Sequence, residues 1–108
     1  MDLSIMTRTE GNAYICTLDG GVDSLNADKL SGEARSAFLS GAKRLIFDLT
    51  KVDYVASAGL GMFVTAIKTF PGTVVFAGLQ PYVRQTFTLN GFNKLAGIYT
   101  TLEEALKG

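Results

Sequence analysis

The chain has 108 residues, 47% of them apolar, and its ten basic and ten acidic side chains cancel to a formal charge of zero. This size predicts one domain over residues 1–108, and the lack of a basic excess argues against nucleic acid or an anionic membrane surface as the partner. No apolar run reaches the ~18–20 residues of a membrane-spanning helix, no signal-like segment opens the chain, and the lone Cys16 excludes an internal disulfide, so we expect a cytoplasmic protein.

The N-terminal segment predicts a hairpin. Two short extended runs, residues 3–7 and 13–18, flank the turn sequence Glu10-Gly11-Asn12. In the second run Tyr14, Cys16 and Leu18 alternate with smaller or β-branched residues, which places Cys16 on an apolar face. We interpret Cys16 as a buried core residue, because the chain has no histidine to activate a thiol.

A helical stripe follows the second strand, which ends at Gly20-Gly21. Its apolar positions are Leu30, Ala34, Ala37 and Phe38, and its candidate N-cap residues are Asp23, Ser24 and Asn26. Ser40-Gly41 predicts its end, with glycine in the left-handed conformation. Asp23 is interpreted first as a residue that starts this helix.

The centre of the chain predicts a strand, a turn and a capped helix. Residues 45–49 are an apolar run of strand length, residues 50–53 are a polar turn, and from Leu60 the apolar residues recur at helical spacing. Ser57 stands where an N-cap is expected. The small residues around it leave the backbone N–H groups of the helix start accessible, and such groups attract anions.

The last third continues the alternation. Phe70-Pro71-Gly72 stops the central helix, residues 73–77 predict a buried strand, and Pro81 opens a helix that Gly91 closes. Residues 97–99 predict a brief strand. A capping box then opens a short final helix, formed either by Thr100 with Glu103 or by Thr101 with Glu104. The whole pattern predicts an α/β fold, with a mixed sheet of about five strands and about four helices.

Several kinds of catalytic site are excluded by composition. Without histidine there is no Ser-His-Asp or Cys-His site, and one cysteine without histidine provides no familiar zinc site. The chain has no phosphate-binding glycine loop that ends in Lys-Ser or Lys-Thr. Asp48 and Asp53 are interpreted as a strand-end residue and a turn residue. We therefore expect a protein that is not an enzyme and uses no metal or cofactor.

The central stretch resembles a known family. Asp48-Leu49-Thr50, followed by the run from Val52 to Gly61 that contains Ala56-Ser57-Ala58-Gly59-Leu60-Gly61, is similar to the signature of STAS domains, and most of all to that of bacterial anti-sigma factor antagonists. Gly20-Gly21-Val22-Asp23 and the run from Val75 to Pro81 extend the resemblance over nearly the whole chain. The resemblance implies the STAS fold and a regulatory, protein-binding function with a kinase-like anti-sigma factor as the partner.

The resemblance also implies a site and a switch. It places partner binding at Asp23 and along the turn and helix start: Tyr54, Val55, Ala56, Ser57, Ala58, Gly59, Leu60, Gly61 and Met62. If Val55 and Met62 rim the turn, they are expected to form an exposed apolar contact spot there, and ordinary helix packing is the alternative role for Met62. Ala56 replaces the family's aspartate, and Ala58 occupies the position read as the phosphorylated one, so the switch is expected to be lost or altered. Ser57 is the substitute acceptor, although a capping role would engage its hydroxyl.

Two other functions fit the same residues. The degenerate sequence Ala56-Ser57-Ala58 suits a turn kept for docking, as in an accessory STAS subunit of a lipid-transport ATPase complex or of a signalling scaffold. A sensor that binds a small anion or a nucleotide at the helix start near Ser57 is the third hypothesis.

Overall fold

Five strands form one mixed sheet in the computed structural model, which describes residues 2–108. The strands are β1 (Ser4–Glu10), β2 (Ala13–Asp19), β3 (Arg44–Lys51), β4 (Thr73–Ala77) and β5 (Gly97–Tyr99). The sheet order follows the chain order. The β1–β2 hairpin is antiparallel, and the three following pairs are parallel. The predicted α/β fold with a mixed sheet is confirmed.

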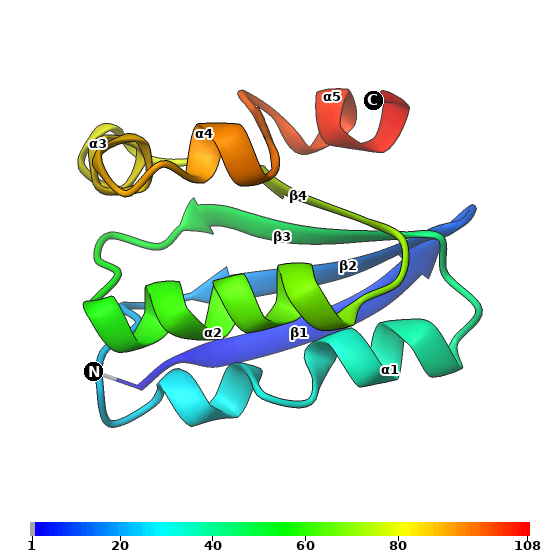
Figure 1. Ribbon diagram of the computed structural model, residues 1–108, viewed down its shortest axis with the longest axis horizontal. Coiled ribbons are helices and arrows are strands. Elements are labelled where there is room, and N and C mark those ends of the chain that lie inside the picture. The colour runs from blue at the N-terminus through cyan, green and yellow to red at the C-terminus, as the bar shows by residue number, and fades with distance from the viewer. Residues whose placement is uncertain (1) are drawn as a thin grey trace.

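In the part of the chain from residue 2 to residue 108, six helical segments connect or follow these strands (Figure 1). They are the 3-10 helix η1 (Ala27–Leu30) and the α-helices α1 (Glu33–Leu39), α2 (Ser57–Thr69), α3 (Pro81–Leu89), α4 (Phe92–Leu95) and α5 (Leu102–Lys107). Helices α1 and α2 lie side by side, with η1 against α2, and α5 lies apart from them. No helix among residues 2–108 combines the length and the hydropathy needed to span a membrane.

The alternation along β2 sends its side chains into two separate cores. Cys16 and Leu18 face the core that α1, α2, α3 and α4 cover, whereas Ala13 and Ile15 face a smaller core under α5. The parallel register places Cys16 beside Phe47 and Ile15 beside Ile46 on β3. The predicted burial of Cys16 is confirmed, because its side chain has no exposed area.

Five phenylalanine rings fill the larger core. They come from β3, β4 and three helices: Phe47, Phe63, Phe76, Phe87 and Phe92. Phe76 lies at the centre, with ring centroids 5.1–6.0 Å from those of the other four. Edge-to-face pairs at such distances add to the stabilisation that burial alone provides. Phe63 belongs to α2, so this cluster fixes the helix that carries the predicted site.

The final helix covers the opposite face of the sheet. The Thr101 hydroxyl accepts a hydrogen bond from the Glu104 N–H at 3.1 Å, and the Glu104 carboxylate accepts one from the Thr101 N–H at 3.1 Å. Of the two capping boxes that the sequence leaves open, Thr101 with Glu104 is the one that forms. Ala105 is then buried against the sheet.

Some predicted boundaries are wrong. The stripe over residues 30–38 is two segments, because the chain leaves the helical path at Ser31 and Gly32 before α1 begins. Phe38 is not a core residue but is 58% exposed, since Ala37 takes the position against the sheet and the next side chain points ~100° further round the helix. Strand β3 continues to Lys51, and the single turn of α4 was not predicted.

Candidate functional site

Two loops at the carboxyl edge of the sheet are joined by main-chain hydrogen bonds. The Val22 N–H donates to the Tyr54 carbonyl oxygen at 2.8 Å, and the Ala56 N–H donates to the Val22 carbonyl oxygen at 2.7 Å. These bonds form a short parallel bridge between Val22 and Val55, both of which are buried. The bridge holds the loop that contains Asp23 beside the turn that opens α2.

Gly59 lets α2 begin directly against this bridge. A Cβ atom at Gly59 would lie 2.6 Å from Cγ1 of Val22 and 3.0 Å from Cγ1 of Val55, which is too close for carbon atoms. Gly61, by contrast, faces open space. The first glycine of the signature is therefore required by packing, whereas the second is not.

Helix α2 starts one residue earlier than the sequence predicts. Ala56 occupies the N-cap in an extended conformation (φ −78°, ψ 169°), because its N–H is held by Val22. Ser57 is the first helical residue, so its predicted capping role is wrong, and no side-chain cap hydrogen bond forms at this helix start. Within residues 2–108 no hydrogen bond engages the exposed Ser57 hydroxyl. The expected competition between capping and modification therefore disappears.

The predicted partner-binding residues differ in burial. The exposed ones are Tyr54, Ser57, Ala58 and Gly61; the half-buried ones are Asp23, Ala56 and Met62; the buried ones are Val55, Gly59 and Leu60. The expectation that Val55 is exposed is wrong, because the bridge to Val22 turns its side chain into the core, where it is 4% exposed. Met62 packs partly against the same core. The exposed residues can contact a partner, and the buried ones determine the shape of the turn.

The prediction that Asp23 starts the helix is wrong, because Asn26, another of the candidate residues, occupies the N-cap of η1. Asp23 instead orders the loop beside Ser57. Its Oδ1 accepts hydrogen bonds from the N–H groups of Leu25 and Asn26 at 2.9 and 3.0 Å. Its own N–H donates to Oδ1 of Asn26 at 2.9 Å. The loop lies close to the turn, because a Cβ atom added at Gly21 would lie 3.7 Å from Cβ of Tyr54.

Leu25 is an exposed residue of this region that the sequence analysis missed. It is 92% exposed in the loop that Asp23 orders. The available signal was an apolar residue between the polar Ser24 and Asn26. A lone exposed leucine is ordinary. Leu25 is a candidate contact residue only because the bridge holds its loop beside the start of α2.

The remaining reactive groups have structural roles. Burial, together with the nearby Glu33 carboxylate, raises the pKa of Cys16 well above that of an exposed thiol, so the nucleophilic thiolate is strongly disfavoured. Its Sγ donates to Oε1 of Glu33 at 3.4 Å. The Asp48 carboxylate accepts bonds from the N–H and the hydroxyl of Thr50 at 3.1 and 2.6 Å. Residues 2–108 contain no group of three or more side chains placed to ligate a metal.

Comparison with known proteins gives a consistent result. The family model described as the STAS domain matches residues 4–105. The chain is 32% identical to BtrV of Bordetella bronchiseptica over 103 residues, which cover 93% of this chain and 88% of the relative. The role proposed in the name of that relative is anti-sigma factor antagonist.

Solved structures show the same fold. An anti-sigma factor antagonist from Mycobacterium paratuberculosis superposes with a TM-score of 0.87 at 20% identity, covering 98% of this chain and 92% of the other. An anti-sigma factor antagonist (STAS) domain protein from Planctomyces limnophilus superposes with a TM-score of 0.83 at 17% identity, covering 95% and 94%. At these identities the two structures support the fold alone.

Proposed function

The chain belongs to the STAS domain family, and on that premise we propose that it is a non-enzymatic, cytoplasmic regulatory module that binds a kinase-like anti-sigma factor through the turn that opens α2. The name of the relative that is 32% identical supports this assignment. The exposed side chains at the turn, Tyr54, Ser57 and Ala58, provide the contact surface. Gly61 adds backbone that a partner can approach closely, since a Cβ atom added there would meet no other atom within 4 Å.

The observation that carries the proposal is the exposed, unengaged hydroxyl of Ser57 at the start of a 13-residue helix. Ser57 is the only hydroxyl residue between Ala56 and Gly61, because Ala58 replaces the position read as phosphorylated. A phosphate on Ser57 adds about −1.5 to −2 charges. The helix start tolerates that charge within the domain, whereas a docked partner is repelled and must desolvate it. We therefore propose a switch that is altered and not lost, with Ser57 as its acceptor.

Affinity capture from an extract of the native cell tests the proposal. The baits are the tagged wild-type chain and the Ser57→Asp variant, with Lys94→Ala, a change on α4, as the matched control. The expected result is a small kinase-like ATPase on the wild-type and Lys94→Ala baits that is depleted on Ser57→Asp. Failure of the wild-type bait to bind any such ATPase at micromolar concentration would overturn the proposal.

An accessory subunit of a larger complex is the second candidate. The alanines at positions 56 and 58 favour it, because a turn used only for docking needs neither the family's aspartate nor a second hydroxyl. The same capture separates the two functions. A transporter ATPase or larger STAS proteins, recovered equally by wild type and Ser57→Asp, would support the accessory role in place of the switch.

A further inference from the structure

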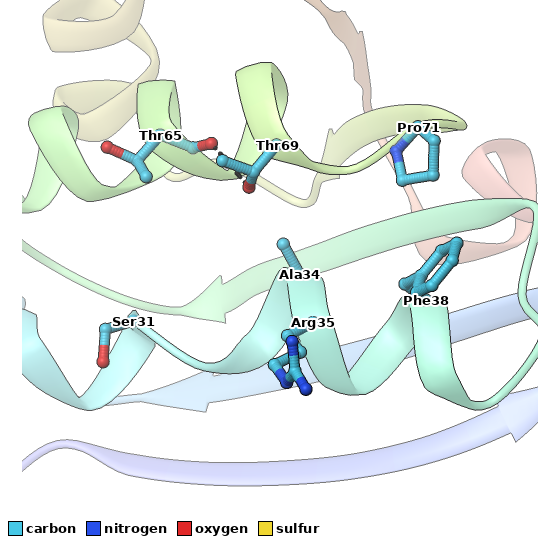
Figure 2. Close-up of a pocket in the computed structure, with 7 residues that line it drawn as sticks. All are labelled: Ser31, Ala34, Arg35, Phe38, Thr65, Thr69 and Pro71. Carbon is cyan, nitrogen blue, oxygen red and sulfur yellow. Dashed lines mark hydrogen bonds between the residues drawn. The ribbon is translucent and has the colours of Figure 1, made fainter.

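A groove lies between α1 and α2 (Figure 2), and the α2 residues that line it belong to the C-terminal half of this helix, whereas Ser57 begins the helix. Its volume is about 410 Å³, and its lining includes Ala34, Arg35 and Phe38 of α1 with Thr65 and Thr69 of α2. A second hollow, of about 560 Å³, shares Phe38 and Pro71 with it and continues to Lys43 and Thr73. These two adjoining hollows are together called the α1–α2 groove.

The charged side chains that line the α1–α2 groove are all cationic. They are Arg35 and Lys43, and no aspartate or glutamate lines either hollow. Among residues 2–108 the only ion pair joins Arg8 and Glu10, so both cations are free of acidic partners. The α2 wall cannot neutralise them either, because residues 54–102 contain no acidic residue. The positive charge of the groove is thus available to an external group.

The uncharged part of the lining suits an apolar side chain. Phe38 is 58% exposed at the point where the two hollows meet. The hydroxyls of Thr65 and Thr69 already donate to the carbonyl oxygens of Gly61 and Thr65, at 3.0 and 2.8 Å, within α2. Their donors are therefore used internally, and only the acceptor capacity of these two hydroxyl oxygens remains for a ligand.

We propose that the α1–α2 groove binds an acidic peptide segment of a partner protein, with an apolar side chain against Phe38 and carboxylates facing Arg35 and Lys43. Charge complementarity selects this occupant, and a lining that extends over both hollows, from Arg35 on α1 to Thr73 on β4, favours a peptide segment over a single small anion. This site is separate from the proposed contact at Ser57. A partner held in the groove leaves the turn free, so one domain can bind two proteins at once.

Nuclear magnetic resonance titration of the full chain tests the proposal. The probe is a peptide of about eight residues in which glutamates flank one leucine, and the matched probe carries lysines in place of the glutamates. The glutamate peptide is expected to give saturable amide shifts confined to α1 and to the C-terminal half of α2. Arg35→Glu with Lys43→Glu is expected to weaken its binding about tenfold, and Phe38→Ser to weaken it further. Lys94→Glu on α4 reverses one positive charge outside the groove and is the control.

The proposal would be overturned by no saturable shift at millimolar peptide, by equal binding of the lysine peptide, or by equal weakening by Lys94→Glu. Inorganic phosphate that produces the same shifts would identify a small-anion site and also contradict it. The amide spectrum of each variant shows whether it is folded. Ser57→Asp is expected to bind the peptide like wild type, which separates this site from the proposed function.

Discussion

The aromatic cluster beneath α2 and the turn that opens α2 both include residues of this helix, Phe63 in the cluster and Ser57 in the turn, but they constrain the sequence in opposite ways. Phe63 and Phe76 are fully buried among other rings, so any loss of volume there is felt by several neighbours. Ser57 and Ala58, only a few residues away, face solvent. The fold depends on the cluster. The turn can therefore differ from the family signature at positions 56 and 58 without loss of the fold.

Replacement of Phe76 by alanine is expected to have the largest effect on this contrast. Phe76 contacts four other rings and has no exposed area, so the cavity should lower the free energy of unfolding by about 3–5 kcal/mol. Phe38→Ala is the matched control, because Phe38 is 58% exposed, and it should change stability by less than ~0.5 kcal/mol. Urea unfolding followed by circular dichroism measures both. An equal loss of unfolding free energy in the two variants would contradict the distinction between the buried cluster and the exposed surface.

The two glycines of α2 sharpen the comparison at the boundary between cluster and turn. Gly59→Ala places a methyl group against Val22 and Val55 and should cost about 1–3 kcal/mol of unfolding free energy. Gly61→Ala meets no atom within 4 Å and should gain up to ~1 kcal/mol through helix propensity. Thermal unfolding of the pair is the measurement. A Gly59→Ala variant as stable as Gly61→Ala would show that the bridge yields to the added methyl group.

The capping box of α5 provides a smaller test on the other face of the sheet. Thr101→Ala removes the hydroxyl that accepts from the Glu104 N–H and should lower stability by about 1 kcal/mol. Thr100→Ala, the alternative that the sequence left open, should be nearly neutral. Hydrogen exchange of the α5 amides, with denaturant unfolding, compares them. A larger effect at Thr100 would contradict the observed cap.

Much of the fold could be predicted because its signals are local. Each of these signals is confined to a single element or its end. They are the alternation along residues 13–18, the apolar run at 73–77, Pro81 at a helix start and the glycines after helix ends. Their burial or conformation agrees with the prediction. Helix α4 was not predicted, because a single turn of four residues is too short to show a hydrophobic period.

The details of the site depended on contacts between distant segments. The bridge between Val22 and Val55 buries Val55, moves the N-cap to Ala56 and leaves Ser57 exposed. None of these outcomes is encoded in the local spacing around Ser57, where a serine before an apolar stripe favours a cap. The exposure of Leu25 and of Phe38 likewise depends on how neighbouring segments pack.

The central claim is that Ser57 contributes to partner binding at the exposed turn and not to the stability of the fold. One variant tests this claim most directly. Ser57→Glu should leave the unfolding midpoint of the chain unchanged, while its affinity for the captured kinase-like partner, measured by calorimetry, falls about tenfold or more through charge repulsion. Ser57→Ala should bind like wild type. Equal affinity of Ser57→Glu and wild type, at unchanged stability, would contradict the account.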